Sequence, residues 1–272
     1  MNVVPEISKR SIVKLINNGK RADGRDFDQR REIVVEPNII TKAEGSAKVT
    51  LGDTQVIVGV KPSIGEPFAD TPDVGVLMTN CEMLPMAAPE FEPGPPSPES
   101  IELARVVDRG IRESELVDLE KLCIEEGKKV WMLFIDLHVI DYDGNLFDCA
   151  NIAVMAALLN TKLPTASIVD DELVLDEENL MDLPVRDKVA LSTFVKIGNG
   201  MVLDPSLEEE EVLDARLSVG VTQNNSYISS MQKGGEVPLT RDEILDAVHT
   251  AIAFKKVKFM RDNESTEEAF QI

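Results

Sequence analysis

The feature that most restricts the fold is a run at residues 149–161 that contains no charged side chain. Surface helices have one polar face, whereas residues 149–159 are rich in alanine and apolar around the whole circumference. A helix of this kind has to be buried on every side, so sheets or other helices must surround it. The run is also shorter than the roughly 20 residues that a membrane-spanning helix needs. We therefore predict a buried helix that ends near Lys162 and Pro164, and no contact with a membrane.

The overall charge restricts the binding partners. The 272 residues include 28 basic and 49 acidic side chains, which gives a net charge of −21. Such a chain cannot bind nucleic acid over its whole surface, because the phosphate backbone is also anionic. Any contact with RNA or DNA must therefore be local or shared with a partner.

The cysteines and the N-terminus indicate the compartment. Cys81, Cys123 and Cys149 are an odd number at wide spacing, so we expect neither a disulfide framework nor a CxxC zinc site. The first eleven residues lack the apolar stretch of a signal peptide. A reducing, cytoplasmic setting is the expectation that follows.

Local patterns in the first half predict strands and helices. An amphipathic helix near the N-terminus is expected to stop at Asn17-Asn18-Gly19. The proline-rich stretch 87–98 must be a surface loop, and Ser97 is expected to cap the helix that follows it. Strand-like segments lie at 33–35, 47–51, 56–60 and 130–141.

The second half begins with an acidic stretch. Between Thr165 and Asp182 there are seven acids and no Lys or Arg, so we expect a solvated connector. A capping box that starts at Thr240 then predicts a long helix. The strand-like segments here are 189–197, 202–203, 215–221 and 226–232.

This order of elements predicts an α+β, or mixed α/β, fold in two related lobes with mixed sheets and packed helices. The expected parts are an N-terminal helix and arm (1–30), a first lobe (31–165), an acidic connector (166–187), a C-terminal lobe (188–260) and a disordered tail (261–272).

Three arginines form a candidate nucleic-acid site. Arg105, Arg109 and Arg112 are spaced so that they lie along one stripe of the helix after the proline-rich loop. Guanidinium groups stay charged and can bind phosphate oxygens bidentately. The alternative is that the arginines are neutralised within the helix, because three acid–base pairs have the correct spacing: Glu102–Arg105, Asp108–Arg112 and Arg109–Glu113.

Other charged clusters have weaker functional signals. The four glutamates 208–211 with Asp214 match no calcium loop, and we expect a solvated turn there. His138 and His249 are far apart and have no nearby cysteine pattern, so structural roles are expected. The segment 9–31 has a local charge of +5, and we expect Arg21 and Arg25 to serve structural and interface roles. We therefore expect no metal and no cofactor.

Four short motifs follow one another in a fixed order along the chain: Arg21-Ala22-Asp23-Gly24-Arg25, Glu44-Gly45-Ser46-Ala47, Gly52-Asp53-Thr54-Gln55-Val56 and Asp141-Tyr142-Asp143-Gly144. In this order and spacing they resemble the RNase PH family along nearly the whole chain. More narrowly, residues 97–109 together with 204–205 and 232–235 resemble the non-catalytic RNase PH-like subunit of the archaeal exosome.

The resemblance implies a phosphate-dependent RNA-degrading chemistry that this chain departs from. Active members of the family cleave RNA from its 3′ end with inorganic phosphate as the nucleophile, and an arginine grips that phosphate soon after the Asp-Gly motif. Here Asp143-Gly144 is followed by Asn145, Leu146 and Phe147, and Phe147 cannot donate a hydrogen bond. No nearby sequence position supplies the missing positive charge. The nearest match to the two aspartates of active relatives is Glu208 with Asp214.

The resemblance therefore implies a non-catalytic subunit of the exosome. It would alternate with the catalytic RNase PH-like subunit in a six-membered ring, a trimer of heterodimers that also carries RNA-binding cap subunits. Arg105, Arg109 and Arg112 would help to hold single-stranded RNA in the partner's active site. Two alternatives stay open: a self-sufficient phosphorolytic exoribonuclease that uses Glu208 and Asp214, and an acidic adaptor without RNA contact.

Overall fold

The computed structural model describes residues 6–169 and 172–256, and its larger sheet has six strands. Their order is β1-β2-β3-β6-β4, and β5 pairs with β6 off this path. Every pair is antiparallel except β4 with β6. The three expected strands before residue 61 and the strand at 130–141 are confirmed, whereas β4 was not predicted. The bounds are β1 (Ile33–Pro37), β2 (Gly45–Leu51), β3 (Thr54–Gly65), β4 (Val76–Met83), β5 (Cys123–Glu125) and β6 (Lys129–Asp141).

The smaller sheet is built from the second half of the chain. It has the order β10-β9-β11-β12, and its pairs are antiparallel. The C-terminal helix packs on it through Ala247 and Ala251, and the N-terminal helix packs on it through Ile12 and Ile16. The bounds are β9 (Val189–Ile197), β10 (Gly200–Leu203), β11 (Ala215–Thr222), β12 (Ile228–Gly235), α5 (Arg241–Ala253) and α1 (Glu6–Asn17).

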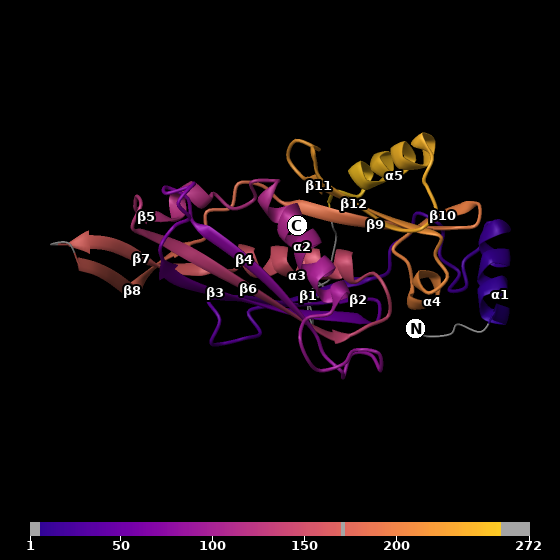
Figure 1. Cartoon of the computed structure of the whole chain (residues 1–272), viewed down its shortest axis with the longest axis horizontal. Helices are drawn as coiled ribbons and strands as arrows, with labels where there is room; N and C mark the ends of the chain where they lie inside the picture. Colours follow the sequence, from indigo (N-terminus) through magenta and orange to yellow (C-terminus); the bar gives the residue numbers. More distant parts are fainter. Residues whose placement is uncertain (1–5, 170–171, 257–272) are drawn as a thin grey trace, which may run out of the picture.

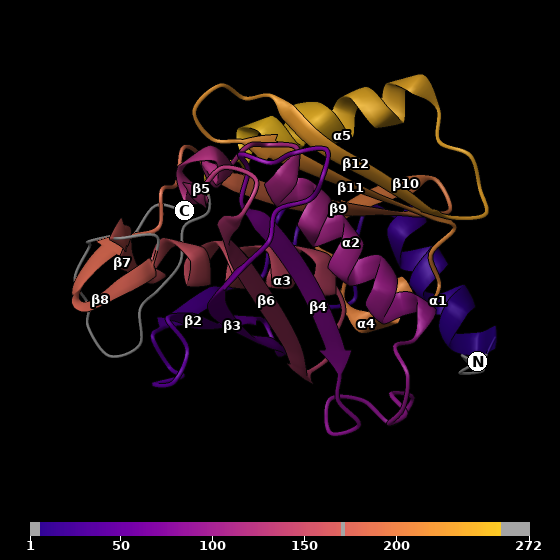
Figure 2. The ribbon, with the colours of Figure 1, turned by 60° about the vertical axis from the view of Figure 1, so that its left-hand side comes forward.

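Two helices lie between these sheets, α2 (Pro98–Arg112) and α3 (Leu146–Leu159). Figure 2 shows the layers in order, with α5, the smaller sheet, the pair α2 and α3, and then the larger sheet. Every residue from Leu146 to Leu158 of α3 is buried, which confirms the expected buried helix. The helix begins three residues earlier than expected because Asn145 caps it, and its alanines let both sheets approach closely.

A network of arginines joins the two halves of the molecule. Arg21 is buried and donates to the carbonyl oxygens of Leu203 and Asp204, at 2.9 and 2.8 Å. It also pairs with the buried Glu209 at 2.6 Å. Arg31 pairs with Asp204 at 2.9 Å. The structural role expected for Arg21 is confirmed, and much of the basic charge of segment 9–31 is neutralised inside the fold.

The expected acidic connector, 166–187, contains a β-hairpin instead. Strands β7 (Lys162–Val169) and β8 (Glu172–Asp182) pair only with each other and project from one end of the molecule (Figure 1). The hairpin satisfies its backbone by cross-strand hydrogen bonds while most of β8 stays exposed. Because few side chains of β8 are buried, apolar and polar residues do not alternate regularly along it. The sequence pattern therefore did not indicate strands in this segment. The expected tail, 261–272, lies outside the described residues.

Two short helices complete the fold, the 3-10 helix η1 (Leu119–Leu122) and α4 (Leu207–Glu210). The mixed α/β architecture in two lobes is confirmed. Within residues 6–169 and 172–256, no helix is both long enough and apolar enough to cross a bilayer.

Candidate functional site

The arginine stripe lies on α2 as the sequence predicts. Ser97 caps the helix and Pro98 opens it. The apolar residues Leu103, Val107 and Ile111 are buried, and the arginine stripe beside them faces solvent. Arg105, Arg109 and Arg112 are all exposed. The side chains of Arg105 and Arg109 form no hydrogen bond or ion pair with any described residue. Two guanidinium groups therefore remain available to an anionic ligand.

Only one of the three intrahelical pairs expected from the spacing of acids and arginines is formed. Asp108 pairs with Arg112 at 3.0 Å, as the spacing predicts. Glu102 does not pair with Arg105 but turns to Arg216 of β11, with Oε1 and Nη2 2.7 Å apart. The structure holds Glu102 there by a second bond, which Gln232 donates at 3.1 Å. Because Glu102 is held by Arg216 and Gln232 of the other lobe, Arg105 is left unpaired.

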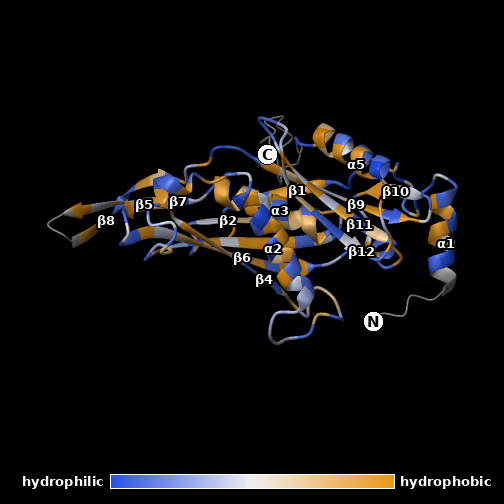
Figure 3. Cartoon of the chain, turned by 45° about the horizontal axis from the view of Figure 1, so that its top comes forward, coloured by the Kyte–Doolittle hydropathy of each residue, from blue (hydrophilic) through white to orange (hydrophobic). Residues whose placement is uncertain are grey.

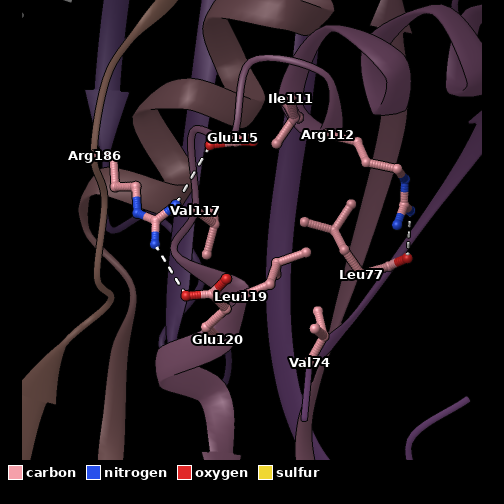
Figure 4. A pocket seen from close by; sticks show the side chains of 9 residues that line it. All are labelled: Val74, Leu77, Ile111, Arg112, Glu115, Val117, Leu119, Glu120 and Arg186. Atoms are coloured by element: carbon pink, nitrogen blue, oxygen red, sulfur yellow. Dashed lines mark hydrogen bonds and ion pairs between the residues drawn. The ribbon is translucent and has the colours of Figure 1, made fainter. Parts of the chain in front are cut away.

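Arg112 lies on the rim of a cleft of about 210 Å³ at the end of α2 (Figure 4). Its guanidinium also donates to the carbonyl oxygen of Leu77 at 2.9 Å. On the other side of the cleft, Arg186 pairs with Glu115 at 3.5 Å and with Glu120 at 3.6 Å. Both cations at this cleft are neutralised, so Arg112 is less available to a phosphate than Arg105 and Arg109.

The Asp-Gly motif forms the turn that leads into α3. Gly144 has φ +84°, and a Cβ atom there would lie 2.5 Å from the backbone of Ser206, so only glycine fits. Buried Thr54 accepts from the Asp143 N–H and donates to the Gly144 carbonyl oxygen, at 3.0 and 2.6 Å. Two of the family motifs, far apart in sequence, are therefore held together at this turn.

The N-terminus of α3 is occupied by a carboxylate of the same chain. The N–H of Asn145 donates to Glu210 Oε1 at 3.0 Å, and the Tyr142 hydroxyl donates to Oε2 at 2.7 Å. The positive end of a helix dipole is a general anion-binding site, and here Glu210 supplies the anion. Burial raises the pKa of Glu210 above its ordinary value, against the opposing effects of Tyr142 and Asn145. Burial and the neighbouring Glu210 raise the pKa of Tyr142 as well.

Phe147 lies buried in the first turn of α3, under a cation from the other lobe. The guanidinium carbon of Arg216 is 4.2 Å from the centre of the Phe147 ring. The expectation that no positive charge replaces the missing arginine was therefore wrong in part, because β11 is distant in sequence but adjacent in space. Arg216 is nevertheless paired with Glu102, and its guanidinium lies over the ring of Phe147.

Glu208 and Asp214, the nearest match to the two aspartates of active relatives, have different surroundings. Glu208 is exposed on α4, whereas Asp214 accepts a hydrogen bond from the Gly198 N–H at 2.7 Å and so stabilises the turn between β9 and β10. The expectation of a solvated turn at 208–211 was wrong, because residues 207–210 form α4, Glu209 is 1% exposed and Glu210 is bonded to Asn145 and Tyr142. Among residues 6–169 and 172–256, no three His, Cys, Asp or Glu side chains are grouped as a metal ion would need.

Sequence reasoning missed the residues that occupy this region, namely Tyr142, Glu210 and Arg216. The capping box of α4, Ser206 with Glu209, is a local signal that could have indicated a helix there. Nothing local indicates that Glu210 reaches α3 or that Arg216 reaches Phe147, because these contacts join two lobes.

Comparison with known proteins assigns the family. The models of the 3′ exoribonuclease family match in two parts, domain 1 at residues 29–164 and domain 2 at residues 187–253. The chain is 61% identical over 252 residues to an exosome complex component Rrp42 of Methanothermobacter thermautotrophicus, with 93% of each chain covered. It is 50% identical to the Rrp42 component of Thermococcus kodakarensis, again with 93% of each covered.

Solved structures agree with this assignment. A chain of an Archaeoglobus fulgidus exosome with RNA bound to the active site has a TM-score of 0.85 and 46% identity, covering 92% of this chain and 95% of that one. A chain of an archaeal exosome core has a TM-score of 0.81 and 44% identity, covering 92% and 94%. This chain belongs to the RNase PH family of 3′ exoribonucleases.

Proposed function

We propose that this chain is a non-catalytic subunit of an archaeal exosome, a complex that degrades RNA from the 3′ end with phosphate. It forms a hexameric ring with a catalytic RNase PH-like subunit, a trimer of heterodimers that carries RNA-binding cap subunits. The relatives named Rrp42 and the exosome structures support this assembly. Its three free cysteines fit a reducing, cytoplasmic setting.

The observation that carries the non-catalytic assignment is Glu210 at the N-terminus of α3. Phosphorolysis needs an anionic nucleophile held by backbone N–H groups and a cation. In this chain the Asn145 N–H already donates to Glu210 at 3.0 Å. A phosphate at that position would meet a carboxylate, and the phenyl ring of Phe147 offers it no donor.

The contribution to RNA binding comes from α2. Arg105 and Arg109 are four residues apart, so their Cβ atoms lie about 5–6 Å apart on one face of the helix and both side chains can reach one RNA backbone. Neither has an internal partner among the described residues. Arg112 contributes less because Asp108 and the Leu77 carbonyl already engage it. The acidic remainder of the surface confines RNA to this stripe.

The assay that tests this function scores nucleoside diphosphate release from single-stranded RNA with phosphate and Mg²⁺. The chain is assayed alone, the catalytic RNase PH-like subunit of the same organism alone, and then both together. We expect no release by this chain and more release by the mixture than by the catalytic subunit. Release by the chain alone would overturn the non-catalytic assignment, and equal rates with and without the chain would overturn its role in completing the partner's site.

A phosphate titration followed by calorimetry tests whether the N-terminus of α3, where Glu210 lies, can still bind an anion. The isolated chain should take up no phosphate at millimolar concentration. Saturable phosphate binding by the wild-type chain would contradict the argument from Glu210.

A further inference from the structure

The β7/β8 hairpin has two unlike faces. Alternate residues of a strand point to opposite sides of the sheet, and cross-strand partners point to the same side. Ala166 is paired with Leu175 and Ile168 with Leu173, so these four apolar side chains share one face. The intervening pairs, Thr165 with Asp176 and Ser167 with Val174, form the other face, which is mainly polar.

The apolar face begins at the core and continues beyond it. Ala166 packs against the main hydrophobic core, which fixes the side of the hairpin that carries these residues. Further out, Ile168 is 37% exposed and Leu175 is 40% exposed. Figures 1 and 3 show the hairpin extending from the end of the molecule, with hydrophobic positions on both strands. The two strands pair only with each other, and the outer part of both stays exposed.

An uncovered two-stranded hairpin is marginally stable in water. Its backbone pairing needs a packed face to persist, and exposed Ile and Leu side chains favour burial against another surface. Burial of Ile168, Leu173 and Leu175 against another protein would therefore stabilise the hairpin.

The charges of the hairpin indicate what covers it. Asp176, Glu177, Glu178 and Asp182 are exposed on β8, while Lys162 is the one basic residue in the described parts of the two strands. RNA and anionic lipid would be repelled by this charge. A second copy of this chain, with a net charge of −21, would also bring acid against acid. Lysine and arginine side chains on a partner protein would complement it.

We propose that the apolar face of this hairpin is a docking surface for a partner protein that presents an apolar groove bordered by lysine and arginine side chains. The inference rests on the proposed membership of an exosome, which supplies the candidate partners, but it does not depend on RNA contact. In this arrangement the two strands give the partner Ile168, Leu173 and Leu175 as anchors, and the acids of β8 align them.

Hydrogen–deuterium exchange on the whole chain tests the proposal. The chain is measured alone and after the catalytic RNase PH-like subunit and each cap subunit of the same organism are added in turn. We expect the amides of 165–168 and 173–176 to exchange rapidly in the isolated chain and about tenfold or more slowly in one of these complexes. Unchanged exchange in a ring that has assembled would overturn the docking surface and leave the proposed function standing.

Paired variants separate the two faces. Ile168→Glu with Leu175→Glu should weaken association with that subunit about tenfold or more, whereas Ser167→Glu with Val174→Glu adds the same charge to the other face and should change it less than about twofold. Glu177→Lys with Glu178→Lys should also weaken association, because the basic border would then be repelled. Circular dichroism checks that each variant keeps the wild-type fold.

Three outcomes contradict the inference in distinct ways. Equal effects of the two paired variants would mean that the apolar face is not the contact. A fall in self-association of the Ile168→Glu, Leu175→Glu variant, with heterotypic binding intact, would assign the face to a second copy instead. If the wild-type chain binds none of the subunits, the proposed function fails and this inference fails with it.

Discussion

The arginines before the first strand and the arginines of α2 differ in what surrounds them. Arg21 is 3% exposed and pairs with Glu209, which is 1% exposed. Arg105 and Arg109 are exposed and have no described partner. The first group has the larger local charge in the sequence, yet its charge is used to join the two lobes.

This difference shows that a basic count along the chain does not locate a binding surface. A guanidinium buried among carbonyl oxygens and carboxylates cannot reach a phosphate without breaking those bonds. An exposed one carries its charge into solvent and attracts an anion at little cost in stability. Substitutions should therefore affect folding at Arg21 and RNA binding at Arg105 and Arg109.

The largest effect is expected for Arg21→Ala. The change leaves Glu209 buried without its cation and removes the bonds to the carbonyl oxygens of Leu203 and Asp204. Breaking a buried pair in this way costs about 3–5 kcal/mol of unfolding free energy. Denaturant unfolding measures it, and Lys20→Ala, which removes an exposed charge one residue earlier, should change the value by less than about 0.5 kcal/mol. Equal losses at both positions would contradict the structural role of Arg21.

Asp204 makes the contact between the two lobes sensitive to acid. Its carboxylate is fully buried and accepts from Arg25, Arg31 and Asn145. Although burial opposes ionisation, these bonds lower its pKa below the ordinary 3.8. The resulting stability is fully present above pH 3.8 and is lost as the pH falls through the lower folded-state pKa. Unfolding followed from pH 6 to pH 2 should show this loss in the wild type, and Asp204→Asn, already weaker at pH 6, should lose less over the same range.

Reversing the exposed arginines should leave the fold unchanged and weaken RNA binding. For Arg105→Glu with Arg109→Glu we expect RNA binding by the assembled complex to fall about 10- to 100-fold near physiological salt, since two phosphate contacts become repulsions. The slope of log affinity against log salt should flatten by about two. Arg112→Glu is the matched control and should have a smaller effect on binding. If RNA degradation by the complex is unaffected by the double change, the chain is an adaptor without RNA contact.

The smallest effect is expected for Glu210→Gln, which compares the half-buried Glu210 with the fully buried Asp204. Burial raises the pKa of Glu210 above its ordinary 4.5, the reverse of Asp204. A raised folded-state pKa means that ionised Glu210 lowers stability, and this penalty grows as the pH rises from about 4.5 through the folded-state value. Relative to Glu210→Gln, the wild type should therefore gain stability on acidification toward pH 4.5, as denaturant unfolding at a series of pH values would show. Parallel stability profiles of the two proteins would show that Glu210 is not perturbed.

Much of the fold follows from local sequence. Ser97 and Thr240 cap helices where expected, because a side-chain oxygen that accepts from the helix N-terminus is a short-range interaction. The apolar run of α3 required burial whatever surrounded it. The spacing of the arginines on α2 placed all three on one exposed stripe.

Contacts between lobes were decided by the tertiary structure alone. Glu210 and Asn145 are 65 residues apart, and Glu102 and Arg216 are 114 apart, so no window along the chain contains either pair. Both pairs form because α2 and α3 lie between the two sheets (Figure 2), so that α4 reaches the N-cap of α3 and β11 reaches α2. The sequence by itself determined which segments form helices and which arginines share a face. Packing of the two lobes decided which charges are neutralised and which stay free, because an ion pair depends on distance in space rather than on separation along the chain.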